Sequence, residues 1–343
     1  MNHINPNIKR RNSSKTNLEE LKNGILSGNR TSLSRAITLV ESQHPKHRLQ
    51  AFELLNWASQ QKNSSIRIGI TGVPGAGKST LIESFGLHII EKGHKVAVLA
   101  IDPSSQNSRG SILGDKTRME ELGKNERAFI RPSAAGKHLG GVAGKTKEAM
   151  TLCEAAGYDV ILIETVGVGQ SEIAVKEMVD FFLLVLVAGA GDELQGIKRG
   201  IMEMADMILI NKAEGDNKVR AQASKIEYSR ALSLFATNAS KWKPKVALCS
   251  ALERLGIENC WQTINSYLDL TKANNFYSDN RKKQNVKWFD KTIKSGLLEI
   301  FYENPGLMKT IAEKSKNVAN NQIDPIAAAY ELIQSIDVKI VAT

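Results

Sequence analysis

The apolar positions of this chain follow a helical pattern first and a strand-like pattern afterwards. From Leu18 to about Gln61 they recur at helical spacing. One face carries Leu33, Ile37 and Val40, and a later face carries Leu49, Phe52, Leu54, Leu55 and Trp57. The pattern predicts two or three helices before any sheet begins.

From residue 66 onward, short β-rich runs alternate with helical segments. The runs are Ile66–Thr71, Lys95–Ile101, Asp159–Glu164, Phe181–Val187, Met207–Asn211 and Lys245–Cys249. This alternation predicts an α/β fold with a mostly parallel sheet covered by helices. Every position of Phe181–Val187 is apolar, as in a strand buried on both faces, so we expect this strand at the centre of the sheet.

The last part of the chain is first polar and then helical again. Residues 271–284 are rich in Asn, Lys and Asp, which favours a linker or extended connection. Apolar residues at helical spacing follow, and Asn304-Pro305-Gly306 interrupts them before two further helices that end near Ile336. A helical hairpin has little core of its own, so we expect it to pack on the main domain or on another chain.

The net charge of +10 raises the question of a nucleic-acid partner. Much of the excess lies in two short segments, one with Lys9, Arg10, Arg11 and Lys15 and the other at 281–283. Neither cluster is accompanied by an aromatic RNA-binding motif, so solvated surface is the favoured interpretation and no nucleic-acid partner is expected. Residues 1–17 lack clear amphipathicity and are interpreted as a disordered basic N-terminus rather than a transit peptide.

The cysteines and the longest apolar runs indicate the cellular compartment of the protein. Cys153, Cys249 and Cys260 are odd in number and form no C-x-x-C pair, which argues against a disulfide or zinc framework and for a reducing compartment. No run approaches the roughly 20 apolar residues that a membrane helix needs. We therefore expect a cytoplasmic protein without a membrane partner.

A complete G-x-x-x-x-G-K-[ST] motif follows the first β-rich run and opens a helix. It consists of Gly72, Val73, Pro74, Gly75, Ala76, Gly77, Lys78 and Ser79, and Thr80 follows it directly. The glycines let the backbone N–H groups and the positive helix end approach phosphate oxygens closely. Lys78 is placed to reach the β- and γ-phosphates, and the Ser79 hydroxyl is placed to ligate Mg²⁺. The sequence predicts a nucleoside triphosphate site.

Acidic residues stand where the next two strands end. Asp102 follows Lys95–Ile101, and Glu164 ends the next run in Glu164-Thr-Val-Gly167. Open α/β sheets bind ligands at these carboxyl ends, so both acids are candidates to hold Mg²⁺ and its waters, and Gly167 is a candidate N–H donor to the γ-phosphate. The alternative interpretation is that either acid only caps a helix.

Two further elements point to guanine. Asn211-Lys212-Ala213-Glu214 resembles the N-K-x-D motif, whose final carboxylate accepts hydrogen bonds from guanine N1 and N2, with Glu214 in place of Asp. Ser250-Ala251-Leu252 matches the S-A-x loop that contacts the guanine oxygen through backbone N–H groups. Their order along the chain predicts GTP and GDP as the ligands.

Taken together, the chain resembles the methylmalonyl-CoA mutase-associated GTPase chaperones, a family once described as transport ATPases or kinases. The resemblance rests on residues 35–42, 72–80, 101–105, 110–119, 139–143, 164–172 and 191–200. It implies switches at 102–119, 164–172 and 188–198, and a weak GTPase that the mutase stimulates. The catalytic residues that the resemblance implies or supports are Lys78, Asp102, Glu164, Asp192 and Lys198. The Mg²⁺ ligands that it implies or supports are Ser79, Asp102, Asp115 and Glu164.

The same resemblance implies the partners and the organisation of the chain. The expected partner is an adenosylcobalamin-dependent acyl-CoA mutase. The protein is expected to gate the delivery of the cofactor to this enzyme and to protect the enzyme. The expected domains are a helical segment at 18–62, a P-loop GTPase domain at 63–270, and a C-terminal helical dimerisation arm at 271–343 that makes a homodimer.

Other classes of function fit less well. Nickel-insertion GTPases hold metal with Cys and His clusters, and the six histidines here form no such cluster with the three cysteines in the sequence. A nucleotide-dependent kinase or ATPase acting on an amino-acid transport system remains the alternative function, although no phosphoacceptor-binding motif is recognisable.

Overall fold

The computed structural model describes residues 17–42, 44–61, 64–101, 119–132, 139–165, 171–188, 199–235 and 239–335. The chain divides into two compact units between Gln284 and Asn285. The predicted basic N-terminus at 1–17 lies outside the described residues except for Asn17. The first switch (102–119) and the third (188–198) lie outside them except for Met119 and Ala188, and so do residues 166–170 of the second switch.

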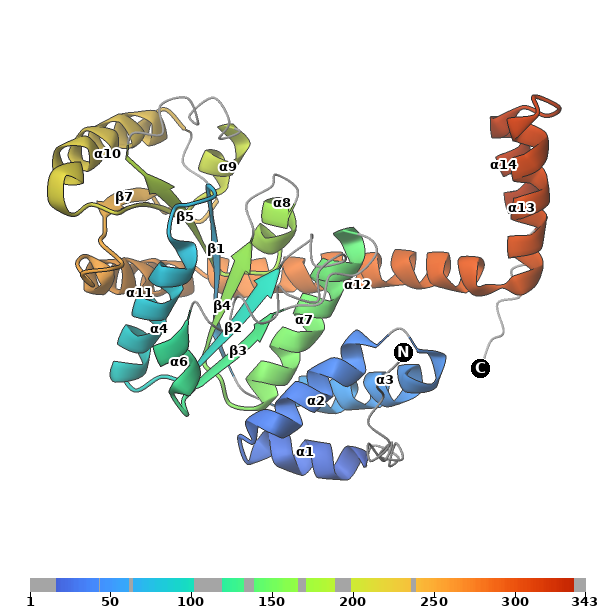
Figure 1. Cartoon of the computed structure of the whole chain (residues 1–343), viewed down its shortest axis with the longest axis horizontal. Helices are drawn as coiled ribbons and strands as arrows, with labels where there is room; N and C mark the ends of the chain where they lie inside the picture. The colour runs from blue at the N-terminus through green and yellow to red at the C-terminus, as the bar shows by residue number, and fades with distance from the viewer. Residues whose placement is uncertain are drawn as a thin grey trace, which may run out of the picture. The chain divides into compact units, whose positions relative to one another are not determined.

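A seven-stranded parallel sheet forms the centre of the first unit (Figure 1). Its strands are β1 (Ile66–Gly72), β2 (Val96–Ile101), β3 (Ala128–Pro132), β4 (Val160–Thr165), β5 (Phe181–Val187), β6 (Met207–Asn211) and β7 (Lys245–Leu248). The order is β3-β2-β4-β1-β5-β6-β7, and every neighbouring pair is parallel. The predicted α/β fold with a mostly parallel sheet is confirmed. The edge strand β3 was not predicted, and β5 lies in the interior beside the central strand β1.

Helices cover both faces of the sheet (Figure 1). One layer contains α4 (Lys78–Glu91), α6 (Glu120–Lys124) and α11 (Ile257–Ala273), and the other contains α7 (Leu139–Ala155), α8 (Ser171–Lys176), α9 (Arg199–Met204) and α10 (Lys218–Ser233). Successive residues of β5 serve the two layers, because side chains alternate along a strand. Leu183 and Val185 belong to the core on the α4 side, and Leu184 and Leu186 to the core on the α10 side.

Three helices precede the sheet, as the apolar periodicity predicts. They are α1 (Leu18–Leu26), α2 (Arg30–Glu41) and α3 (Pro45–Ser59), and α2 and α3 pack on α7. The predicted face of α2 is buried, but Leu49 and Phe52 on α3 are 76% and 68% exposed. The buried positions of α3 are Leu54 and Ala58, since α2 and α7 meet the helix along that side.

The predicted linker at 271–284 is wrong, because these residues are mostly helical. α11 continues to Ala273, and α12 (Phe276–Glu303) begins three residues later. Polar side chains are used here for anchoring rather than for solvation: Tyr277 donates to the Ser65 carbonyl at 3.2 Å, and Gln284 donates to the Val179 carbonyl at 2.7 Å. Composition alone does not distinguish these two uses.

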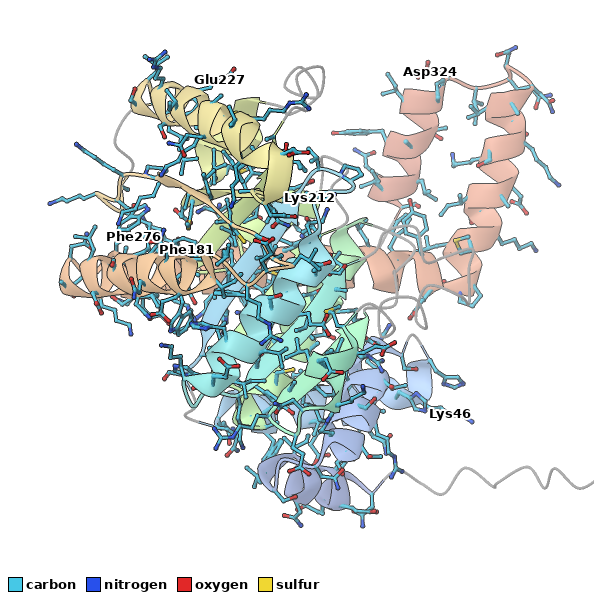
Figure 2. All side chains as sticks on the ribbon, turned by 60° about the vertical axis from the view of Figure 1, so that its left-hand side comes forward. Lys46, Phe181, Lys212, Glu227, Phe276 and Asp324 are labelled. Atoms are coloured by element: carbon cyan, nitrogen blue, oxygen red, sulfur yellow. The ribbon has the colours of Figure 1, made fainter. Side chains whose placement is uncertain are left out.

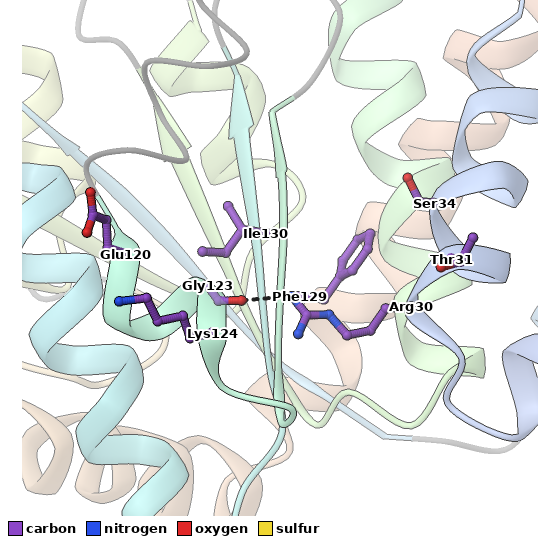
Figure 3. Close-up of a pocket in the computed structure, with 8 residues that line it drawn as sticks. All are labelled: Arg30, Thr31, Ser34, Glu120, Gly123, Lys124, Phe129 and Ile130. Atoms are coloured by element: carbon purple, nitrogen blue, oxygen red, sulfur yellow. Dashed lines mark hydrogen bonds between the residues drawn. The ribbon is translucent and has the colours of Figure 1, made fainter.

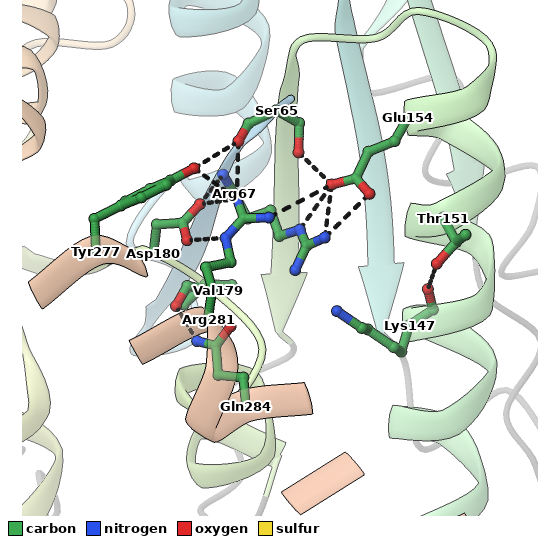
Figure 4. Close-up of polar contacts among 10 residues, drawn as sticks. All are labelled: Ser65, Arg67, Lys147, Thr151, Glu154, Val179, Asp180, Tyr277, Arg281 and Gln284. Carbon is green, nitrogen blue, oxygen red and sulfur yellow. Dashed lines mark hydrogen bonds and ion pairs between the residues drawn. The ribbon is translucent and has the colours of Figure 1, made fainter. Parts of the chain in front are cut away.

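Arg281 is the strongest of these anchors (Figure 4). Its Nε and Nη2 each lie 2.6 Å from an oxygen of Asp180, and Nη2 also donates to the Ser65 carbonyl at 2.8 Å. Asp180 in turn accepts the backbone N–H of Arg67 at 2.8 Å, and the Arg67 guanidinium forms two bonds to Glu154. This buried polar cluster joins the start of α12 to the start of β1.

The second unit contains the rest of α12 together with α13 (Pro305–Ala319) and α14 (Pro325–Gln334), which pack on each other. The two helices after Asn304-Pro305-Gly306 end close to the predicted position. Many large apolar side chains of this unit are exposed, including Val286, Phe289, Ile293, Leu297, Leu298 and Tyr302. Among the described residues, no helix is long and apolar enough to cross a membrane.

Candidate functional site

The predicted phosphate loop connects β1 to α4. A Cβ at Gly72 would lie 2.0 Å from the Val185 carbonyl oxygen, and a Cβ at Gly77 would lie 2.8 Å from the Asn211 side-chain nitrogen. Gly77 also has φ of 77°, which favours glycine. The loop is therefore packed closely against β5 and β6, and its backbone conformation is determined by contacts that other residues would disrupt.

Lys78 begins α4 and reaches back over the loop. Its Nζ donates to the carbonyls of Gly72 at 2.9 Å and Val73 at 3.2 Å. Burial lowers the pKa of Lys78, while the carboxylates of Glu164 and Glu172 oppose that shift. A phosphate would supply the negative charge that this partly desolvated ammonium group lacks.

The acidic side of the site comes from β4. Because β1 and β4 pair in the register Ile70 to Glu164, the carboxylate lies one strand away from the phosphate loop. Glu164 is 9% exposed, and its Oε1 accepts a long hydrogen bond of 3.4 Å from the Ser79 hydroxyl. The next residue, Thr165, donates to the Thr71 hydroxyl at 2.8 Å and ties the ends of the two strands together.

Ser79 and Glu164 supply oxygen donors, which is the ligand type that Mg²⁺ selects. Among the described residues there is no cluster of three or more His, Cys, Asp or Glu that could hold a metal ion. The predicted metal ligands Asp102 and Asp115 and the predicted contacts Gly167, Asp192 and Lys198 lie outside those residues.

The predicted guanine elements meet at the ends of β6 and β7. Asn211 is 2% exposed; its Nδ2 donates to the Ala76 carbonyl at 2.8 Å, and its Oδ1 accepts the Ala251 N–H at 3.0 Å. The Ala213 N–H donates to the Cys249 carbonyl at 3.0 Å. Asn211 thus connects the phosphate loop to the loop Ser250–Leu252, which are far apart in sequence.

Lys212 and Glu214 follow Asn211. Lys212, labelled in Figure 2, has φ of 58°. Glu214 immediately precedes a short 3-10 helix, η1 (Gly215–Asn217), and its Oε2 is buried without a hydrogen-bond partner in the described part of the chain. Burial, followed by the Glu214 carboxylate, raises the pKa of the Cys249 thiol to about 12. A buried acceptor of this kind fits a ligand that brings N–H donors.

The structure brings the phosphate loop, Ser79 with Glu164, and Asn211 with Glu214 and Ser250–Leu252 to the same edge of the sheet. Pro74 and Thr80 lie within the same loop and helix start. Two residues that the sequence did not single out as site residues also belong here. Glu172 on α8 is 2% exposed and acts electrostatically on Lys78, and Ser84 on α4 contacts the loop after β7. Ser84 could have been noticed as a polar residue within the apolar stripe of Leu81, Ile82 and Phe85.

A pocket of about 500 Å³ lies elsewhere, between α2, α6 and the edge strand β3 (Figure 3). The Arg30 guanidinium crosses it to the carbonyls of Gly123 at 3.0 Å and Asn125 at 3.2 Å. Its lining contains none of the predicted site residues; it consists of Arg30, Thr31, Ser34, Glu120, Gly123, Lys124, Phe129 and Ile130. It is therefore separate from the nucleotide loops.

Comparison with known proteins gives a consistent result. The family model described as methylmalonyl Co-A mutase-associated GTPase MeaB matches residues 33–306. The GTPase ArgK of Escherichia coli is 44% identical over 309 residues, covering 90% of this chain and 93% of the relative. The mitochondrial methylmalonic aciduria type A homolog of Mus musculus is 44% identical over 328 residues, covering 93% and 79%.

A solved structure supports the same assignment at the level of the fold. The crystal structure of a protein named LAO/AO transport system kinase superposes with a TM-score of 0.72 and 37% identity, and the match covers 94% of this chain and 99% of that one. Several relatives of this chain are named as GTPases. The geometry of the nucleotide loops and these matches over most of the chain lead to one conclusion: the protein belongs to the methylmalonyl-CoA mutase-associated GTPase family.

Proposed function

We propose that this protein is a GTP-hydrolysing chaperone that gates the delivery of adenosylcobalamin to an acyl-CoA mutase, methylmalonyl-CoA mutase or a close relative, and protects that enzyme. The observation that carries the guanine part is the Oε2 atom of Glu214, which is buried and has no hydrogen-bond partner among the residues that the structure describes. Guanine presents N1–H and N2–H donors to such an acceptor, whereas adenine presents no donor at N1. The description of the family supports the mutase part.

The proposed division of roles follows the site. Gly72–Thr80 cradle the phosphates, and Lys78 neutralises their charge. Ser79 and Glu164, with Asp102 and Asp115, hold Mg²⁺, which stabilises the charge on the transferred phosphoryl group when bound. Asn211, Lys212, Glu214 and the Ser250–Leu252 loop recognise the base. Gly167, Asp192 and Lys198 complete the hydrolytic site.

Nucleotide state would control the gate through the switches. Loops ordered by the γ-phosphate relax after hydrolysis and change the surface that the mutase contacts. The exposed apolar side chains of α12 to α14 support a homodimer, because an apolar face of this extent is a common interaction surface. A cytoplasmic setting remains the prediction from the three cysteines, which are buried and unpaired.

GTPase assays with and without the mutase test the proposal. The mutase should increase turnover by a large factor, for which about a thousandfold has precedent in GTPases activated by a partner. Lys198→Ala should keep GTP affinity and basal turnover and lose the stimulation, whereas Lys78→Ala should lose both rates. Full stimulation in Lys198→Ala would show that the coupling runs through other residues.

Pull-down experiments with and without a non-hydrolysable GTP analogue test the partner itself. Recovery of a mutase in a nucleotide-dependent manner supports the chaperone function. The alternative is a kinase or ATPase of an amino-acid transport system, a function suggested by the name of the protein whose crystal structure superposes on this chain. Phosphoryl transfer from GTP or ATP to a transport protein, without mutase binding, would favour that alternative.

A further inference from the structure

Ser84 lies on α4 beyond the residues that contact phosphate, and it makes an unusual contact for a serine within a helix. Its side chain is 8% exposed, and its hydroxyl donates to the Ala251 carbonyl at 2.6 Å. Helical serines often donate to a carbonyl of their own helix, as Ser229 does to Lys225 and Ser266 does to Gln262. Ser84 instead connects the phosphate-loop helix to the loop that follows β7.

The Ala251 carbonyl that Ser84 contacts belongs to the peptide group between Ala251 and Leu252, whose other polar group is the Leu252 N–H. Because a trans peptide is planar, its C=O and N–H point in opposite directions, so a bond to the Ala251 carbonyl also fixes the direction of the Leu252 N–H. The hydrogen bonds among the described residues leave this N–H without an acceptor. Ala251 donates its own N–H to Asn211, and Glu253 donates its N–H to the Ser250 hydroxyl.

The loop around this peptide is held on its other sides as well. Ser250 and Leu255 exchange two backbone hydrogen bonds of 3.0 Å each, which close the loop. The Ala251 side chain is 3% exposed, whereas the Leu252 side chain is 77% exposed. The Ala251–Leu252 peptide therefore lies at the border between the core and the open side of the site, and Ser84 holds it from the core side.

We propose that Ser84 is a positioning residue for base recognition: it orients the Ala251–Leu252 peptide so that the Leu252 N–H donates to the 6-oxo group of guanine. This inference rests on the proposed guanine-nucleotide function. A donor at the carbonyl also polarises the amide and strengthens its N–H as a donor, because hydrogen bonds in a chain reinforce one another.

Calorimetric titration of the full-length protein with three nucleotides tests the role of Ser84. GDP and IDP both carry the 6-oxo group, and 6-thio-GDP replaces that oxygen with sulfur, a weak acceptor, while keeping N1–H. Ser84→Ala should weaken GDP and IDP binding by about fivefold, which corresponds to one neutral hydrogen bond, and 6-thio-GDP by less than about twofold. Ser84→Thr, which keeps the hydroxyl, should restore most of the GDP affinity.

Two further variants complete the design. Ser266→Ala, a helical serine with an intrahelical bond on α11, should leave all three affinities unchanged. Ser84→Cys keeps the size of the side chain but has only a weak S–H donor, so it should show the same selective loss. It provides the measurement if the alanine variant does not fold.

The outcomes separate the inference from the function on which it rests. An equal loss for all three nucleotides would mean that Ser84 only stabilises the site, and an unchanged GDP affinity would mean that it has no role in recognition; either result overturns the inference. A parent protein that binds ADP as tightly as GDP would instead overturn the guanine assignment itself.

Discussion

Arg281→Leu gives the sharpest test of how the start of α12, up to Gln284, is held within the first unit. The substitution removes the guanidinium that contacts both oxygens of Asp180 at 2.6 Å, and the aspartate is only 4% exposed. The carboxylate would retain the Arg67 N–H at 2.8 Å but would lose its countercharge. Breaking a buried ion pair by removing one partner costs about 3–5 kcal/mol, so we expect the free energy of unfolding to fall by that amount.

Urea denaturation followed by tryptophan fluorescence measures this change, because Trp242 and Trp261 are buried in the core of the same unit. Lys282→Leu is the matched control. The Lys282 side chain is 76% exposed and pairs with Asp279 on the surface at 3.1 Å, so its loss should cost less than about 1 kcal/mol.

A double variant isolates the buried charge as the cause. Asp180→Asn combined with Arg281→Leu keeps an amide oxygen for the Arg67 N–H and removes the unpaired carboxylate, so it should regain about 2 kcal/mol relative to Arg281→Leu. A loss of less than about 1 kcal/mol in Arg281→Leu, or a double variant no more stable than the single one, would contradict a buried charge pair between Arg281 and Asp180. GDP affinity should stay the same in all variants, since the cluster lies at the start of β1 and the phosphate loop follows its end.

Three further predictions concern titration, base choice and assembly. Burial, and next the Arg67 guanidinium, lower the pKa of Lys147 to about 7 from 10.5, so the unfolded chain binds more protons between these pH values and stability rises with pH across that window. Lys147→Met should therefore raise the free energy of unfolding at pH 6.5 by about 3 kcal/mol and change it little at pH 10.5. The magnitude takes roughly 1.4 kcal/mol for each unit of the pKa shift and lowers the total because the side chain is partly exposed. An equal gain at both pH values would contradict this prediction. In calorimetric titrations the affinity for GDP should be much higher than the affinity for ADP. Glu214→Asp should tighten GDP binding by roughly 1 kcal/mol. An unchanged or weaker GDP affinity in this variant would show that the glutamate already places its carboxylate correctly. Deletion of residues 285–343 should convert a dimer into a monomer that still binds nucleotide. If light scattering still reports a dimer after the deletion, these residues do not form the dimer interface.

The strands and the phosphate loop could be predicted because their signals are local. A short all-apolar run such as Phe181–Val187 is typical of a strand buried on both faces. The backbone of the phosphate loop Gly72–Ser79 requires glycines wherever such a loop occurs. The edge strand β3 escaped prediction because Ala128–Pro132 is short and ends in Arg131 and Pro132. At an edge, a strand needs apolar side chains at fewer positions, so its pattern is weak.

Polar segments were harder to interpret, because the same residue type serves solvent or a partner. Residues 271–284 have the composition of a linker, but Tyr277, Arg281 and Gln284 meet acceptors on Ser65, Val179 and Asp180. Those acceptors lie far away in the sequence and are brought together only by the pairing of β1 and β5. In the same way, α3 buries Leu54 rather than Leu49 and Phe52, since the inward side is chosen by α2 and α7.

By itself, the sequence determined the α/β class, the order of the nucleotide motifs and the family, because these depend on short patterns and on their succession along the chain. The tertiary structure decided which residues meet. It put Asn211 between Ala76 and Ala251, buried a Glu214 oxygen that has no partner in the described part of the chain, and placed Ser84 against the Ala251 carbonyl. These contacts join residues from different strands and helices, and their geometry follows from the strand order and helix packing, which no local pattern encodes.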